Sequence, residues 1–184
     1  MVVGIVSKAL SVAVIGSQIF IILSVFLLIF LKKESRPLFN FLAVNALKLA
    51  FLVALVATSG SLFYSEYAKF TPCLLCWLQQ IFMYPLVVLF AIAVSKKDDK
   101  IFTYTLPLAV IGWFISLYHN YISYRVIGSV ACRIGESCVT PYVCDFGYIT
   151  IPMMAFIAFS LIIILALANK YYITYPKSNN YGRS

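Results

Sequence analysis

Long apolar runs, each broken by a short segment that carries lysine or arginine, are the feature that most restricts the fold of this chain. The first run, 9–31, can cross a membrane, because about 20 helical residues at 1.5 Å each span a hydrocarbon core of ~30 Å. It exceeds the apolar region of a signal peptide, which is about 7–15 residues. Lys32, Lys33 and Arg36 follow it as a stop signal. The runs therefore predict transmembrane helices.

Composition supports a polytopic all-α membrane protein of one domain. Hydrophobic residues make up 63% of the 184 residues and charged residues 11%, too few to cover a soluble fold of this size. The net charge of +8 does not indicate a nucleic-acid ligand, because the basic residues are spread between the apolar runs. The predicted spans are 9–31, 46–66, 74–94, 102–118 and 148–168.

The segments between the spans complete this plan. Residues 39–45 are expected to form an interfacial piece, with Lys48 reaching the inner membrane surface. The segment 119–146 is the one long polar connection. The tail from Asn169 is short and polar, and we expect it to be poorly ordered.

Lysine and arginine are distributed unevenly between the two sides of these spans. Four lie on one side: Lys8, Lys69, Arg125 and Arg133. Ten lie on the other: Lys32, Lys33, Arg36, Lys48, Lys96, Lys97, Lys100, Lys170, Lys177 and Arg183. The positive-inside rule therefore places the N-terminus outside and the C-terminus in the cytoplasm. All five cysteines then lie on the outer, oxidising side, where disulfides persist: Cys73, Cys76, Cys132, Cys138 and Cys144.

Cys73 and Cys76 form a C-x-x-C pair at the start of the third span. We expect Thr71 to cap the helix and Pro72 to occupy its first position. Both sulfurs would then lie in the first turn, where the positive end of the helix favours a thiolate. The pattern indicates a redox-active dithiol. A structural disulfide and half of a metal site remain alternatives.

Cys132 and Cys138 lie in the outer loop on either side of Gly135, where a turn would let the small ring close. Two pairs in series could relay electrons from the aqueous side into the bilayer. Alternatively, this pair staples the loop. Cys144 is an incidental thiol or competes with Cys132 for Cys138. A zinc site would need Cys132, Cys138 and His119 as further ligands, at a spacing that fits no familiar zinc module.

Four more residues are candidates for binding a ligand beside the dithiol. Gln79 and Gln80 lie in the second turn of the third span, where an unpaired amide is costly. They could bond a neighbouring helix or a quinone carbonyl. Trp77 flanks a ring-shaped ligand or belongs to the interfacial aromatic belt. His119, where the fourth span meets the loop, is on spacing alone more often structural.

Four motifs together resemble the disulfide bond formation protein B (DsbB) family. They are GSLFYSE at 60–66, PCLLCWLQQ at 72–80, the Tyr118–His119 pair and FGYITIP at 146–152. In this order they are most similar to its short-loop (BdbC-like) branch from Gram-positive and related bacteria, over roughly 45–168. The resemblance implies a four-helix transmembrane bundle in the bacterial cell membrane, to which the first span is an addition.

The resemblance also implies an activity, in which a thioredoxin-fold (DsbA-like) partner passes electrons through the protein to a membrane quinone, ubiquinone or menaquinone. Cys132 would form the mixed disulfide with the partner, and Cys138 would resolve it. Cys73 would exchange with the loop pair, and Cys76 would face the quinone. His119 matches a family histidine near the quinone. No metal is implied.

The chain departs from the family pattern in three places. Gln80 stands where the family usually has an arginine that helps to bind the quinone, Cys144 is extra, and the span 9–31 lies outside the four-helix pattern. Two other readings stay open. A vitamin K epoxide reductase-like oxidase is disfavoured, because in that family the loop pair precedes the C-x-x-C. A membrane protein with structural disulfides or a metal-handling role is the non-enzymatic alternative.

Overall fold

The computed structural model describes the backbone of residues 2–30, 36–70, 72–127 and 149–180. Its side chains are described over 3–21, 41–70, 72–98, 100–124 and 149–171. The long elements are all helices: α1 Val2–Phe30, α2 Arg36–Leu62, α3 Leu74–Lys96, α4 Phe102–Ile127 and α5 Ile151–Asn180. A π-helical turn, η1 Phe63–Tyr67, follows α2, and a 3-10 turn, η2 Asp99–Ile101, precedes α4. The predicted all-α membrane bundle is confirmed.

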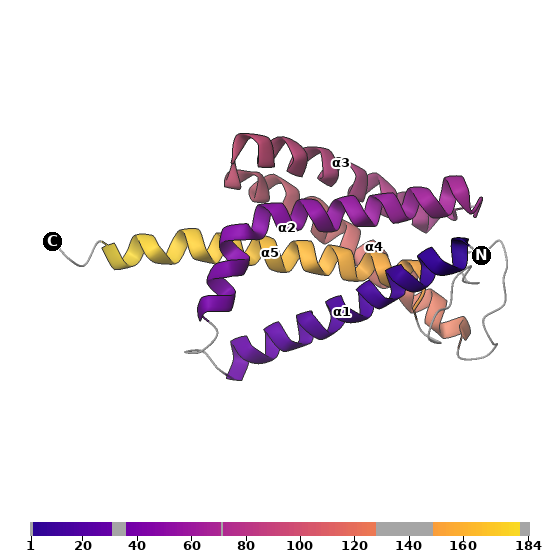
Figure 1. Cartoon of the computed structure of the whole chain (residues 1–184), viewed down its shortest axis with the longest axis horizontal. Coiled ribbons are helices and arrows are strands. Elements are labelled where there is room, and N and C mark those ends of the chain that lie inside the picture. Colours follow the sequence, from indigo (N-terminus) through magenta and orange to yellow (C-terminus); the bar gives the residue numbers. More distant parts are fainter. Residues whose placement is uncertain (1, 31–35, 71, 128–148, 181–184) are drawn as a thin grey trace.

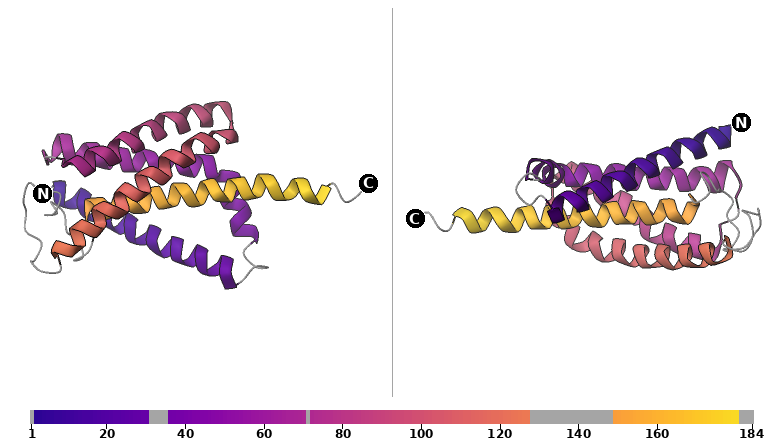
Figure 2. Two further views of the ribbon diagram at one scale, coloured as in Figure 1. Left: turned by 180° about the vertical axis from the view of Figure 1, so that it is seen from behind. Right: turned by 90° about the horizontal axis from the view of Figure 1, so that it is seen from below.

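Four helices pack in a ring, in which α2 contacts α3 and α5, and α4 contacts the same two helices (Figure 1). Small residues let α2 approach its neighbours closely: Ala43, Ala46, Ala50 and Ala54 are at most 1% exposed. Leu86, Phe90, Phe159 and Ile162 fill the core opposite them. The fifth helix, α1, lies outside the ring, packs mainly on α5 and crosses the bundle obliquely (Figures 1 and 2).

Four helices of the described chain contain stretches long and apolar enough to cross a membrane: Val3–Ile21, Phe41–Tyr67, Leu74–Lys96 and Ile151–Tyr171. The fourth predicted span, α4, is not among them. Its polar residues face inward, because Thr105, Ser116, His119, Asn120 and Ser123 are buried. Tyr104, Phe114 and Tyr121 are exposed on its outer surface. α4 is thus apolar toward the lipid and polar toward the bundle, which lowers its average hydropathy.

Several predicted boundaries are wrong. α4 continues to Ile127, so residues 119–127 are helical and do not belong to a loop. α5 continues to Asn180, so the tail expected to be poorly ordered is helical over most of its length. In both cases helical hydrogen bonding extends the element past the end of the apolar run. α2 begins at Arg36, and its first turns bend away from the rest of the helix (Figure 1).

Candidate active site

Cys73 is the N-cap of α3, with an extended backbone (φ −74°, ψ 169°). The prediction of Thr71 as N-cap and Pro72 as first helical residue is therefore wrong, since the helix begins only at Leu74. The Cys73 carbonyl accepts a 3.0 Å hydrogen bond from the Trp77 amide, which closes the first turn. This geometry keeps both sulfurs at the N-terminal end of α3, where helix amides favour negative charge.

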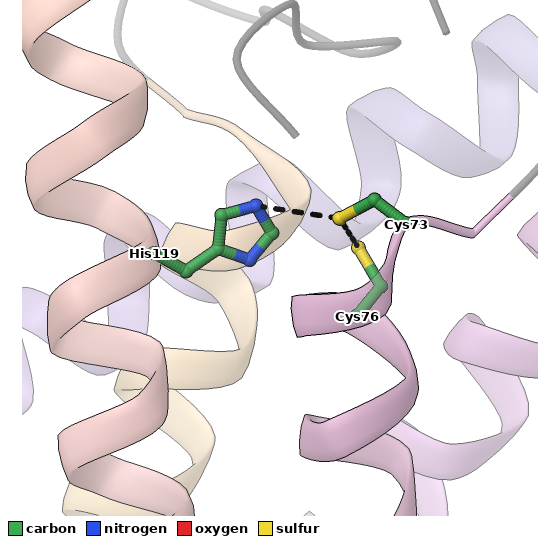
Figure 3. A group of neighbouring side chains, drawn as sticks. All are labelled: Cys73, Cys76 and His119. Carbon is green, nitrogen blue, oxygen red and sulfur yellow. Dashed lines mark hydrogen bonds between the residues drawn. The ribbon is translucent and has the colours of Figure 1, made fainter. Parts of the chain in front are cut away.

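The two thiols lie side by side and face a histidine from another helix (Figure 3). The Cys73 thiol donates to Cys76 Sγ at 3.4 Å, and Cys73 Sγ lies 3.8 Å from His119 Nε2. Both cysteines are half-buried, whereas His119 is 2% exposed. The structure therefore brings His119 beside Cys73 and Cys76, although more than 40 positions separate the histidine from either cysteine in the sequence.

Gln79 contacts the His119 ring nitrogen that does not face the cysteines. Its Nε2 lies 3.1 Å from His119 Nδ1, and both side chains are buried. An amide can donate through nitrogen to a bare Nδ1 or, turned over, accept through oxygen from a protonated Nδ1. Gln79 can therefore pair with either neutral tautomer of His119.

Gln80 donates a 2.8 Å hydrogen bond to Ser61 Oγ on α2. The costly intramembrane amide is therefore paired with a neighbouring helix, one of the two outcomes expected from sequence. Ser61 lies within the GSLFYSE motif, but the sequence by itself indicates no role for its hydroxyl. The Gln80–Ser61 pair is uncharged, whereas the family pattern has a positively charged arginine at the position of Gln80.

The cysteines open onto a cavity of about 320 Å³ between the helices. Its polar lining near the cysteine pair includes Gln79, Gln80 and His119. Its walls are mainly apolar and come from all five helices, with Met83, Phe159 and Pro152 among them. The π-helical turn contributes Tyr64, which stacks on Phe70 at a ring-centroid distance of 5.9 Å. π-helical turns are often found at functional sites.

One predicted site residue that the structure describes, Trp77, is not brought into this cavity. Trp77 is 55% exposed and does not line it, the position expected of an aromatic-belt residue. Cys132 and Cys138 lie outside the described residues, as does Cys144. Ser123 lines the cavity one turn after His119; the sequence predicts a loop at this position, so it indicates no site role for Ser123.

The two cysteine sulfurs and the His119 imidazole could also hold a metal ion. Cys73, Cys76 and His119 each offer one ligand atom, and these atoms lie within 4.8 Å of one another. Zinc prefers four cysteine or histidine ligands in a tetrahedron. Among the described residues this set supplies three of the four, so it leaves one coordination position for another ligand.

Comparison with known proteins shows the family to which this chain belongs. A family model described as "Disulfide bond formation protein DsbB" matches residues 43–169. The chain belongs to the DsbB family. It is thus an integral membrane protein of a family of disulfide-forming oxidoreductases, as the motifs implied. The matched region covers α3 and α4 completely and leaves α1 outside.

Individual relatives agree with this placement. The chain is 48% identical to "Disulfide bond formation protein C" of Bacillus subtilis (strain 168) over 118 residues, 62% of this chain and 85% of the relative. It is 46% identical to "Probable disulfide formation protein C" of Bacillus cereus (strain ATCC 14579) over 123 residues, 65% and 87% of the two chains. It is 41% identical to the "SPbeta prophage-derived disulfide bond formation protein B" of Bacillus subtilis over 120 residues. No solved structure gives a significant match.

Proposed function

We propose that this protein is a quinone-dependent thiol oxidase that reoxidises a thioredoxin-fold disulfide donor outside the bacterial cell membrane. The observation that carries the proposal is the Cys73–Cys76 thiol pair at the mouth of a largely apolar cavity, with Gln79, Gln80 and His119 beside it. A dithiol at a helix start suits thiol–disulfide exchange. An apolar cavity with a few convergent polar groups suits a ring-shaped ligand.

The hydrogen-bond donors and the walls of the cavity are chemically suited to a quinone. Gln80 and Gln79 carry N–H groups that can donate to a ring carbonyl, and the cavity walls match an apolar ring. When bound, the quinone accepts two electrons and two protons. Trp77, which is exposed and does not line the cavity, is assigned to the aromatic belt in this proposal.

In this proposal the four cysteines transfer the electrons, and His119 accepts a proton. A thiolate of the partner attacks the loop disulfide at Cys132, which forms a mixed disulfide and releases Cys138 as a thiol. The partner's second thiol then displaces Cys132, so the partner leaves as a disulfide and both loop cysteines are thiols. Cys73 then exchanges with the loop pair, and the loop disulfide is restored as Cys73 and Cys76 become thiols. Oxidation of this pair to a disulfide releases two electrons and two protons. His119 Nε2, 3.8 Å from Cys73 Sγ, is placed to accept one proton.

A quinone-reduction assay with purified protein in detergent tests this scheme. The donor is a reduced thioredoxin-fold protein, and quinone absorbance is followed. We expect turnover by the wild type and by Cys144→Ser, which serves as the matched cysteine control. Cys76→Ser and Cys132→Ser should each lose turnover, because each breaks one pair.

The other outcomes distinguish the alternatives. Loss in Cys76→Ser but not in Cys132→Ser would leave the loop pair as a structural staple. A wild type that turns over no quinone but retains a stoichiometric, chelator-removable zinc ion would favour a metal-handling role. That role is the second candidate because Cys73, Cys76 and His119 form a compact donor set.

A further inference from the structure

Helix α1 supplies one wall of the cavity beside the cysteines, although it lies outside the region matched by the family model. Leu10, Ala13, Val14 and Ser17 are its contributions. The Leu10 side chain reaches α2 near this end, because a Cβ atom on Gly60 would lie 3.4 Å from Leu10 Cδ1. The additional helix therefore changes the shape of the site and does not merely flank it.

A second cavity, of about 430 Å³, continues from the first, and its described lining comes from α1, α2 and α5. The two share four lining residues: Ala13, Ser17, Val53 and Leu161. The second extends along α1 to Phe20, so from Leu10 the combined groove follows about 15 Å of helix at 1.5 Å per residue. It runs away from the cysteines toward Phe41 and Ala168.

The polarity of this groove changes along its length. At the cysteine end it presents Gln79, Gln80 and His119. Beyond Val53 the described residues that line it are apolar except for Ser17, whose hydroxyl donates to the Ala13 carbonyl at 2.8 Å and is thus occupied within α1. A ligand that matches it has a small polar head and a long apolar tail.

We infer that the groove beneath α1 binds the polyprenyl tail of the quinone whose ring lies beside Cys76. This inference rests on the proposed function, because the tail is placed by continuity with the proposed ring site. Lipid chains are as apolar as the groove, so packing against α1 orients and retains the tail without a hydrophobic driving force. The expected effect on binding is therefore moderate and specific to tailed quinones.

Gly16 offers a way to fill the groove without disturbing the packed core. It lines the second cavity, and a Cβ atom added there would meet nothing within 4 Å. Gly4, on the same helix, is equally open but lines neither cavity. Gly16→Phe and Gly4→Phe are therefore the same change in similar helical surroundings, one inside the groove and one outside.

The test measures KM and kcat for a long-chain polyprenyl quinone and for a tail-less quinone with the same ring, using full-length protein in detergent. We expect Gly16→Phe to raise KM for the tailed quinone at least about fivefold, a moderate change because groove and lipid are similarly apolar. KM for the tail-less quinone should stay unchanged. Gly4→Phe should match the wild type with both, and thermal unfolding should show that both variants are folded.

Each other outcome contradicts a different claim. If Gly16→Phe behaves like Gly4→Phe with the tailed quinone, the tail does not bind in the groove, while the oxidase function stands. If Gly16→Phe weakens both quinones equally, the groove is not specific to the tail. If the wild type reduces neither quinone, the proposed function fails and this inference fails with it.

Discussion

At the scale of single residues, His119 links the redox pair to the interior of the bundle. One ring nitrogen faces Cys73 Sγ at 3.8 Å and the other faces the Gln79 amide at 3.1 Å. The ring is nearly fully buried, so its orientation depends on these contacts and on packing. Gln79 acts in our scheme as a positioning residue, which holds Nε2 toward the thiol.

Replacing Gln79 tests this assignment. Gln79→Leu leaves a buried ring nitrogen without its partner, a loss of about 1–3 kcal/mol. We expect disulfide formation between Cys73 and Cys76 in a single turnover to slow roughly tenfold, the equivalent of about 1.4 kcal/mol. Acid quenching and alkylation of the thiols would measure it. Gln79→Glu, which can still accept from Nδ1–H, should recover most of the rate. Equal rates in the two variants would show that the hydrogen bond has no positioning role.

At the scale of helices, α4, which carries His119, packs closely against α5. Gly112 on α4 is packed against Phe159 of α5, and a Cβ atom there would lie 2.3 Å from Phe159 Cζ. Phe159 is fully buried and also lines the cavity. A single glycine thus lets the two helices approach at the level of the site.

Gly112→Ala should therefore be destabilising, although alanine is the better helix former. The added methyl group forces Phe159 to move within a packed core, and such overpacking costs about 1–3 kcal/mol. We expect a lower Tm in detergent, measured by circular dichroism. Gly4→Ala is the matched control, since nothing lies within 4 Å of its added Cβ, and its Tm should be unchanged or higher. A Gly112→Ala variant as stable as the wild type would disprove the close contact.

At the scale of the whole molecule, the N-terminus and the start of α3, where the cysteine pair lies, are at one end of the bundle, and the C-terminus is at the other (Figures 1 and 2). The sequence predicts five spans, an odd number, which places the two termini on opposite sides of the membrane. The arrangement of the helices agrees with this prediction. Which end faces the cytoplasm is inferred from the lysine and arginine distribution. The proposed oxidase needs the cysteine end outside, where its partner works.

Labelling of single cysteines in intact cells tests this orientation. In a background with all five native cysteines changed to serine, we would introduce Glu66→Cys at the cysteine end or Lys96→Cys at the other. Both positions are exposed. A membrane-impermeant maleimide should label Glu66→Cys, and should label Lys96→Cys only after the cells are lysed. The reverse pattern would invert the topology and place the redox pair in the cytoplasm.

The described structure confirms a large part of the sequence analysis. The apolar runs predicted a helical membrane bundle, because only segments that satisfy their own backbone hydrogen bonds can cross lipid. The C-x-x-C at the start of α3 is a local pattern, so its spacing alone placed both sulfurs together. The motifs around it predicted the family, which the match over residues 43–169 shows.

Only the tertiary structure decided which distant residues meet at the site. The continuation of α4 through His119 to Ile127 could not be predicted, because the polar residues at its end, among them His119, Asn120 and Ser123, are buried in the bundle but are equally typical of a loop. The pairing of Gln80 with Ser61 and the groove beneath α1 depend on how helices cross. Periodicity along a chain sets which residues share one helix face, but packing between helices sets what each face meets.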